Sequence, residues 1–185
     1  MRSFKKSYKV QDYYYTPSIL INPILKYLKP NSTIWCPFDT EDSLYVKILR
    51  ENGFKVIATH IDIDNGDFFE LDIDCDYIIS NPPFSDKIDI FKKLFELNKP
   101  FMMLMNIMVL NYQVIGDLFY EAQEDYNKDI QLLIFDKKVS FNGNTSSFNS
   151  SYICYNVLPK QIIWEHLKDN NSGKFYRGEF NYDND

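Results

Sequence analysis

A short apolar segment of the chain stops abruptly at Asn81 and is followed by two prolines and an aromatic residue. Residues 75–79, apolar apart from Asp76, are typical of a buried strand. Because proline cannot donate to the hydrogen-bond ladder of a sheet, this strand must end before Pro82 and Pro83. A residue that precedes a proline is held in extended geometry, so we expect extended backbone at Asn81 and Pro82. The Asn81 side chain and the Pro82 carbonyl can then point the same way off the end of the strand.

Strand and helix patterns alternate along the middle of the chain. Strand-like apolar runs occupy residues 33–36, 54–60, 75–79 and 101–105, and helical patterns occupy residues 17–28, 44–52 and 87–97. Further strands are expected at 130–135 and 152–157, with a polar loop at 139–151 between them. This alternation predicts an α/β sandwich with a mainly parallel sheet and a closing antiparallel hairpin. Such proteins bind ligands at the carboxyl ends of their strands, which is where Asn81 is expected.

The length of 185 residues fits a single domain. We expect residues 1–12 to form a basic arm and residues 159–185 to form a short C-terminal helix and a tail. No segment is large enough for a separate target-recognition domain. No apolar run is long enough to cross a membrane, and no signal sequence is expected at the start.

The charge and the cysteine content exclude several classes of site. A net charge of −6 argues against a free-standing DNA-binding protein of high affinity, although basic clusters such as Lys87, Lys92 and Lys93 remain. The three cysteines are widely spaced in strand-like runs, so we expect buried thiols in a reducing cytoplasm, with neither disulfides nor a zinc site. With only two histidines, no metal centre is expected.

The sequence Asn81-Pro82-Pro83-Phe84 resembles motif IV of the S-adenosylmethionine-dependent amino-methyltransferases, above all those that methylate the exocyclic amine of adenine in DNA. The resemblance implies the class I methyltransferase fold, a Rossmann-like three-layer sandwich, with S-adenosylmethionine as cofactor. It also implies that these four residues are catalytic and that Asn81 contributes to the cofactor site. The structural alternative is an ordinary turn of two prolines after a strand. The resemblance covers residues 13–158, with the other motifs in the family's order.

The segment Tyr15-Thr16-Pro17 is similar to motif X, which contacts the methionine end of the cofactor in this family. The same residues also have a purely structural interpretation. Thr16 as N-cap and Pro17 at the first helical position predict the start of a helix.

Motif I is expected at Cys36-Pro37-Phe38, which keeps the family's Pro-Phe but lacks its acidic residue and its glycine-rich turn. The acidic loop that follows looks like the EcoRI-methylase group and its phage-encoded relatives. In that resemblance Asp39 would bind the amino group of the cofactor's methionine moiety. No glycine-rich phosphate loop occurs in the chain, which argues against NAD or ATP as ligand.

Candidates for binding the ribose and the adenine of the cofactor follow the second strand. A nucleoside site needs a carboxylate at the end of this strand to hold the two ribose hydroxyls. His60 occupies that position by count, and Asp62 is the better chemical candidate because a carboxylate can accept from both hydroxyls. Asp67 and Phe68 resemble motif III, in which the acid accepts from the adenine amino group and the aromatic packs on its ring. The alternatives are a structural histidine and a loop acid beside core phenylalanines.

The loop between the last two expected strands resembles motif VIII of the family. There an aromatic side chain faces the aromatic of motif IV across the target base. Phe148 is the first candidate for this role and Phe141 the second, each opposing Phe84. A loop phenylalanine tucked under its own hairpin is the structural alternative.

The resemblance predicts a small DNA adenine methyltransferase of the type that phages and mobile elements carry. Loops, the basic arm, a second copy of the chain or an accessory protein would then recognise the DNA. Two other functions stay open. One is methylation of an amino group in RNA adenine or protein glutamine, which the same motif serves. The other is a catalytically silent binding module, which the altered motif I and the negative net charge favour.

Overall fold

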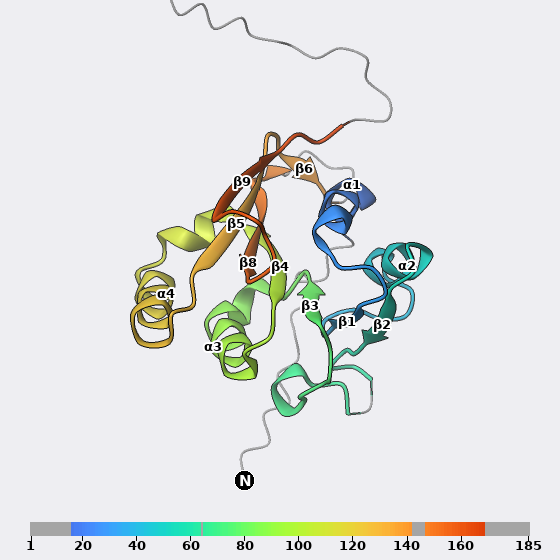
Figure 1. Cartoon of the computed structure of the whole chain (residues 1–185), viewed down its shortest axis with the longest axis horizontal. Coiled ribbons are helices and arrows are strands. Elements are labelled where there is room, and N and C mark those ends of the chain that lie inside the picture. Colours follow the sequence, from blue (N-terminus) through green and yellow to red (C-terminus); the bar gives the residue numbers. More distant parts are fainter. Residues whose placement is uncertain (1–15, 64, 142–146, 169–185) are drawn as a thin grey trace, which may run out of the picture.

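Seven strands form one sheet in the computed structural model of the protein, which describes residues 16–63, 65–141 and 147–168. The strands of this sheet are β1 (Thr33–Cys36), β2 (Lys55–Ala58), β3 (Tyr77–Ser80), β4 (Phe101–Asn106), β5 (Ile130–Phe135), β8 (Ser150–Tyr155) and β9 (Ile162–Glu165). Two short strands, β6 (Val139–Ser140) and β7 (Ser147–Phe148), pair separately with each other. The strand order in the large sheet is β2-β1-β3-β4-β8-β5-β9 (Figure 1).

The sheet is parallel apart from β8, which runs antiparallel to β4 and to β5. From β1 the chain moves outward to β2 and then returns to lay β3 on the other side of β1. The position between β1 and β3 is therefore a topological switch point, where open α/β sheets bind their ligands. The predicted fold class is confirmed: a mainly parallel α/β sandwich closed by an antiparallel hairpin.

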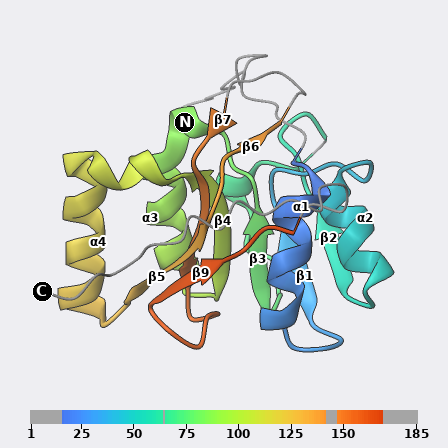
Figure 2. The ribbon, with the colours of Figure 1, turned by 90° about the horizontal axis from the view of Figure 1, so that it is seen from above.

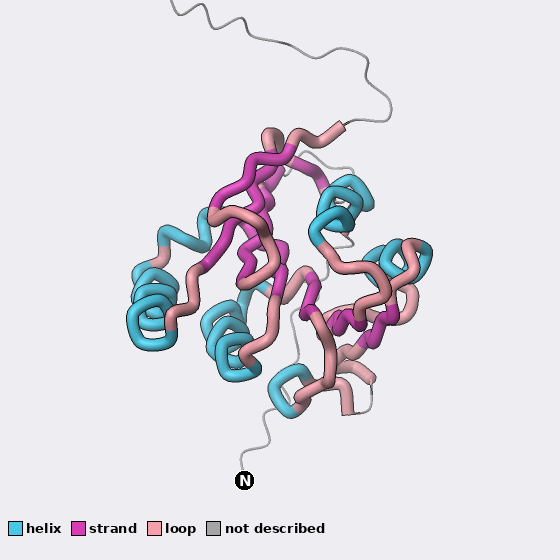
Figure 3. The backbone as a smooth tube through the Cα atoms, viewed as in Figure 1, coloured by secondary structure: helices cyan, strands magenta, loops and turns pink. Residues whose placement is uncertain are grey.

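Helices cover both faces of the sheet and make three layers (Figure 2). The α-helices are α1 (Ser18–Ile21), α2 (Leu44–Glu51), α3 (Lys87–Leu97) and α4 (Gln113–Tyr126). Short 3-10 helices are η2 (Asn22–Tyr27), η3 (Phe68–Glu70), η4 (Phe84–Asp86) and η5 (Ile107–Asn111). α1 and α2 lie on one face of the sheet, and α3 and α4 lie on the other, as the tube view also shows (Figure 3).

Each face of the sheet has its own hydrophobic core, and β4 contributes to both. Met102 and Leu104 pack in the cluster under α1 and α2, and Met103 and Met105 pack in the cluster under α3 and α4. None of the four is more than 1% exposed. Because neighbouring side chains of a strand point to opposite faces, a strand covered on both faces has no polar side. This explains the uninterrupted apolar run that predicted a buried strand here.

Local signals define the ends of α2 and α3. The Ser43 hydroxyl accepts a hydrogen bond from the Val46 N–H (3.3 Å) and so caps α2. Gly53, with φ of 85°, follows the end of α2, as is common where a helix closes through the left-handed region. Asn98, with φ of 52°, closes α3 in the same way. α3 occupies the predicted residues 87–97, and α2 ends one residue before the predicted 52.

The structure corrects the prediction for the first helix. α1 begins at Ser18 with Pro17 as its N-cap residue, so Thr16 does not cap it. The α-helix lasts only 4 residues before it tightens into η2, in which Pro23 occupies an early position. Proline has no N–H to donate, so it interrupts an α-helix but is tolerated at the start of a helical segment.

The structure also corrects two predictions near the end of the described chain. The predicted C-terminal helix is wrong, because residues 162–165 form the edge strand β9, parallel to β5. The predicted polar loop at 139–151 contains β6 and β7. Within the described residues, no helix is long and apolar enough to cross a membrane.

Candidate active site

The loop that follows β1 meets the end of β3 at the switch point through a hydrogen bond between side chains. The Ser80 hydroxyl, in the last residue of β3, donates to the Asp39 carboxylate in the loop after β1, with 2.5 Å between the two oxygens. Asp39 is also fixed through its backbone, because its N–H donates to the Thr59 carbonyl just beyond β2 (3.2 Å). The carboxyl ends of three neighbouring strands, β1, β2 and β3, are therefore joined around Asp39.

Burial makes the Asp39 carboxyl unusual. The residue is only 9% exposed, and burial raises its pKa from 3.8 to about 6. Hydrogen bonds from the Ser80 and Ser43 hydroxyls favour the ionised form and lower the pKa, but burial outweighs them. A buried carboxylate with only two hydroxyl donors is costly for the fold, and an approaching cation would stabilise its charged form.

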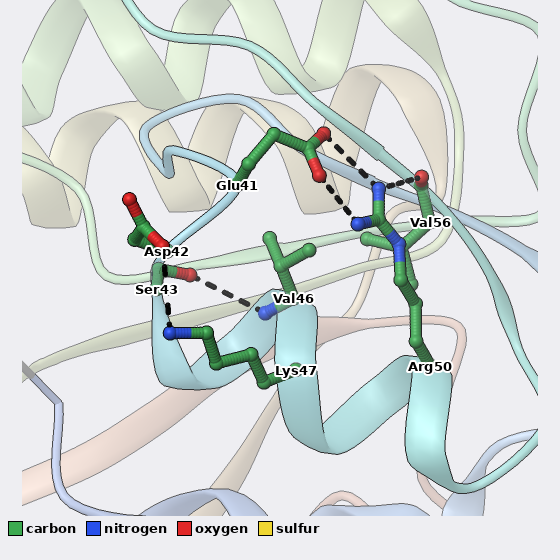
Figure 4. A network of polar contacts seen from close by, with 7 residues as sticks. All are labelled: Glu41, Asp42, Ser43, Val46, Lys47, Arg50 and Val56. Atoms are coloured by element: carbon green, nitrogen blue, oxygen red, sulfur yellow. Dashed lines mark hydrogen bonds and ion pairs between the residues drawn. The ribbon is translucent and has the colours of Figure 1, made fainter.

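Side-chain contacts hold the loop between β1 and α2 in shape without glycine (Figure 4). Glu41 pairs with both terminal nitrogens of the Arg50 guanidinium, which also donates to the Val56 carbonyl of β2 (3.1 Å). Asp42 pairs with Lys47 of α2 at 3.6 Å. Exposed pairs of this kind contribute about 0–1 kcal/mol each. Their main effect is to fix the path of the loop. A glycine-rich turn would fix this path through its backbone conformation instead of through side-chain contacts.

The four residues of the proline motif follow β3 directly at the same edge, as predicted. Pro82 and Pro83 are buried, Asn81 is partly exposed with a buried side-chain oxygen, and Phe84 is half-buried against the core under α3 and α4. Pro83 has extended backbone, with ψ of 133°, and precedes η4. The Lys87 ammonium donates to the Phe84 carbonyl (3.4 Å) from the first position of α3.

The predicted ribose-binding residues lie at the carboxyl end of β2. His60 is 7% exposed, and its Nδ1 accepts from the Asp62 N–H (3.2 Å), whereas the Asp62 carboxylate is exposed. A Cβ at Gly66 would lie 2.1 Å from the His60 carbonyl oxygen, so the backbones approach too closely for a side chain. His60 supports this turn, and the position of Asp62 leaves its carboxylate accessible to a ligand.

The predicted adenine-binding residues differ in accessibility. Asp67 accepts from the Phe69 N–H (3.0 Å) and so caps η3. Phe68 is 1% exposed and packs against Trp35 and Phe38, with ring centroids 5.4 and 5.0 Å away. A ring so buried stacks within the core, and the half-buried Phe38 is the more accessible aromatic of this cluster.

The remaining cofactor candidates are mostly enclosed. Thr16, Cys36 and Pro37 are buried, and Pro17 is half-buried. Burial raises the pKa of the Cys36 thiol well above its ordinary value, so this thiol stays neutral in the core. Only the backbone of such residues can contact a ligand. Tyr15 lies outside the described residues.

The two candidates for the second aromatic of the base site lie in the hairpin after β5. β8 begins at Ser150 opposite Asn106, the last residue of β4, so the end of β7 at Phe148 reaches the carboxyl edge of the sheet. The Ile107 N–H, which follows β4, donates to the Asn149 carbonyl (2.8 Å). The Phe148 side chain lies outside the described part. Phe141 packs against the core under α1 and α2, whereas Phe84 packs against the opposite core.

Sequence reasoning did not identify Ser80 and Ser43 as partners of Asp39. The available signal was a hydroxyl at the last position of an otherwise apolar strand, at Ser80. No group of three or more His, Cys, Asp or Glu side chains able to hold a metal ion occurs among the described residues.

Comparisons with known proteins identify the fold. No protein-family model and no curated protein matches the sequence. Among solved structures, the chain is similar to a protein of Listeria monocytogenes named as a class I S-adenosylmethionine-dependent methyltransferase, with a TM-score of 0.58 and 14% identity over 91% of this chain and 70% of that chain. A precorrin-6Y C5,15-methyltransferase of Geobacter metallireducens is similar with a TM-score of 0.42 and 12% identity over 75% of this chain and 85% of that chain. The first likeness shows the class I methyltransferase fold.

Proposed function

We propose that this protein transfers a methyl group from S-adenosylmethionine to the exocyclic amino group of adenine in DNA. The observation that carries the proposal is the position of Asn81-Pro82-Pro83-Phe84 at the switch point, next to the hydrogen bond between Ser80 and Asp39. A neutral amide and a carbonyl at this position suit an amino substrate, because both are hydrogen-bond acceptors. The fold is that of methyltransferases with the same cofactor.

Residues at the carboxyl edge fit S-adenosylmethionine. The buried Asp39 carboxylate matches the ammonium of its methionine moiety, since a cation there would offset the cost of the buried charge. The exposed Asp62 carboxylate, at the end of β2, matches the ribose hydroxyls. Asp67 and the half-buried Phe38 lie in the segments proposed to hold the adenine. When bound, the cofactor supplies an electrophilic methyl group.

Asn81 and Pro82 would activate the substrate. The lone pair of an adenine amino group is delocalised into the ring, so this nitrogen is a weak nucleophile. The Asn81 side-chain oxygen and the Pro82 carbonyl would each accept one amino hydrogen and favour a tetrahedral, electron-rich nitrogen. These hydrogen bonds strengthen as the nitrogen becomes tetrahedral. They therefore stabilise the transition state more than the bound substrate.

The proposed chemistry also sets a requirement on the DNA. Within a base-paired duplex the adenine amino group is engaged in the pair and cannot meet both Asn81 and Pro82, so the base would leave its stack to react. Phe84, with Phe148 as its proposed opposite partner, would stack on the extruded base. Base–aromatic stacking contributes about 1–3 kcal/mol per base, which is comparable to the cost of unstacking.

The first experiment is calorimetric titration with S-adenosylmethionine and S-adenosylhomocysteine. We expect micromolar binding that is weakened in Asp39→Asn and in Asp62→Ala. Asp42→Ala is the matched control, because this carboxylate is exposed in the same loop as Asp39. Well-folded protein that binds neither compound at millimolar concentration would refute the enzymatic function and leave the silent binding module.

The second experiment measures methyl transfer to DNA, RNA and protein acceptors, with Asn81→Ala as the inactive variant. We expect transfer to adenine in DNA and a loss of at least 100-fold in rate for Asn81→Ala, because one of the two acceptors is removed. Cofactor binding by this variant, measured in parallel, separates a lost catalytic group from a lost site. Transfer to RNA or to protein glutamine, without transfer to DNA, would replace the proposed substrate.

A further inference from the structure

Three large apolar side chains are exposed in the segment that follows β4. Met108 is 52% exposed, Tyr112 is 56% exposed and Val114 is 53% exposed. All three lie within seven consecutive residues: Met108 in η5, Tyr112 at the junction of η5 and α4, and Val114 in the first turn of α4. Because β4 delivers the chain to the carboxyl edge of the sheet, this segment begins at the edge that carries the proline motif.

Lys87 connects this segment to the proline motif. Its ammonium lies 4.6 Å from the centroid of the Tyr112 ring, a cation–π contact, and donates to the Phe84 carbonyl (3.4 Å). The exposed ring is thus held beside the last residue of the motif by a positive charge. A cation next to an accessible aromatic face is the combination with which proteins bind single-stranded nucleic acid.

The backbone holds this segment in a defined position. The Asn106 side chain accepts from the Met108 N–H (3.0 Å), and the Tyr112 carbonyl accepts from the Ile115 N–H (3.0 Å). Ile115 is fully buried, so the start of α4 is anchored in the core while Tyr112 stays at the surface. A preorganised aromatic loses little conformational entropy when a ligand binds.

The charge around Tyr112 is mixed. Lys87 lies over its ring, and Asp86 and Asp89 stand on either side of Lys87 in the sequence. The first turn of α4 contains no acidic residue. The acidic residues of α4, from Asp117 onward, come later in the helix.

We infer that Tyr112 and Lys87, flanked by Met108 and Val114, contact the nucleic-acid strand that carries the target base. Tyr112 stacks on an unpaired base next to the extruded one, and Lys87 binds a phosphate of the same strand. The inference rests on the proposed function and names a surface with which this chain holds its substrate. The sequence alone predicts no role for the segment that holds Met108, Tyr112 and Val114.

Fluorescence anisotropy with a labelled adenine-containing DNA strand, single and in a duplex with a mismatch, tests the inference without any methyl transfer. We expect Tyr112→Ala to weaken binding by about 5- to 100-fold and Tyr112→Phe to bind like the unmodified protein, because stacking needs only the ring. Lys87→Gln should lower the salt dependence of binding by about one phosphate contact. Tyr120→Ala is the matched control, since Tyr120 is 66% exposed on α4, the helix that Tyr112 precedes.

The outcomes separate the inference from the proposed function. Equal loss of binding in Tyr112→Ala and Tyr120→Ala, or no loss in either, would overturn the inference even if the protein methylates DNA. Absence of DNA binding, or binding only to RNA or to a protein partner, would overturn it as well. Binding that depends on Tyr112 but is accompanied by no methyl transfer would support the inference and refute the proposed catalysis.

Discussion

Replacement of Asp39 by asparagine tests whether the protein keeps a buried charge that weakens its own fold. The pKa of this carboxyl is about 6, against an ordinary value of 3.8, because the side chain is buried. Ionisation is therefore harder in the folded protein than in the unfolded chain. The difference between the two pKa values corresponds to about 3 kcal/mol of stability lost at pH 7.5.

Asparagine has almost the same shape as aspartate and is neutral at every pH. Its carbonyl oxygen can still accept from the Ser80 hydroxyl, and its amide can donate to the Ser43 oxygen if that hydroxyl rotates. We expect Asp39→Asn to raise the free energy of unfolding at pH 7.5 by about 1–3 kcal/mol. The gain is near the lower end of this range if one hydrogen of the introduced asparagine amide finds no acceptor, because an unsatisfied buried donor costs about 1–3 kcal/mol by itself.

The sign of the pH dependence follows from proton linkage. Because the folded state binds the Asp39 proton more tightly, the stabilisation from this group is complete below about pH 4 and is lost as the pH rises through about 6. The variant lacks this proton. The difference in free energy of unfolding between the variant and the unmodified protein should therefore be small at pH 4 and largest above pH 7.

Urea denaturation followed by circular dichroism, at a series of pH values from 4 to 8, measures this difference. Asp42→Asn is the control: its carboxylate is exposed, so it should change stability by less than about 0.5 kcal/mol with no step near pH 6. Destabilisation by Asp39→Asn at pH 7.5, or a difference that is constant across the pH range, would refute the reasoning.

The proposed function adds an expectation for the same variant. A hydrogen bond to a charged group contributes about 1.5–3 kcal/mol, so Asp39→Asn should bind S-adenosylmethionine roughly 10- to 100-fold more weakly. A variant that is more stable and binds worse would show that the charge serves the ligand. If the affinity for the cofactor is unchanged, Asp39 is not part of its site.

Two further predictions concern the interior around the site. Gly66→Ala should lower the free energy of unfolding by roughly 1–3 kcal/mol, because its Cβ would collide with the His60 backbone; an unchanged urea midpoint would contradict this close approach. Tyr45 and Tyr152 share a buried hydrogen bond (2.6 Å between hydroxyl oxygens), and Tyr152 donates onward to the Leu20 carbonyl (3.1 Å). Tyr152→Phe should therefore destabilise the protein by about 2–3 kcal/mol and Tyr45→Phe by about 1 kcal/mol, as thermal unfolding can measure. A larger loss of stability in Tyr45→Phe than in Tyr152→Phe would show that the hydrogen bonds do not run from Tyr45 through Tyr152 to the Leu20 carbonyl.

Local sequence determined most of the secondary structure near the site. The run 101–105 is apolar at every position, and only a strand buried on both faces accommodates such a run in a short length. The helix at 87–97 has apolar residues at helical spacing and lies between proline-containing segments. Pro82 and Pro83 ended β3 by chemistry alone, because they have no N–H for the ladder.

Local sequence did not determine the last strand. Ile162, Ile163 and Leu167 are compatible with a short helix, and two neighbouring isoleucines are equally compatible with a strand. The hydrogen bonds that decide the matter come from β5, which lies about 30 residues earlier in the chain, as in the bond from the Leu132 N–H to the Gln161 carbonyl (2.7 Å). Strand pairing is a long-range property, so a short apolar segment is ambiguous without its partner.

The candidate site divides in the same way. The sequence by itself determined which polar residues stand at the ends of buried strands: Asn81 after β3 and Asp39 after β1. Only the tertiary structure decided that Ser80 meets Asp39, because these residues are 41 positions apart and the crossover that makes β1 and β3 neighbours brings them together. The buried carboxylate and its raised pKa exist for the same reason, since desolvation and hydrogen bonding depend on distances through space that no local pattern contains.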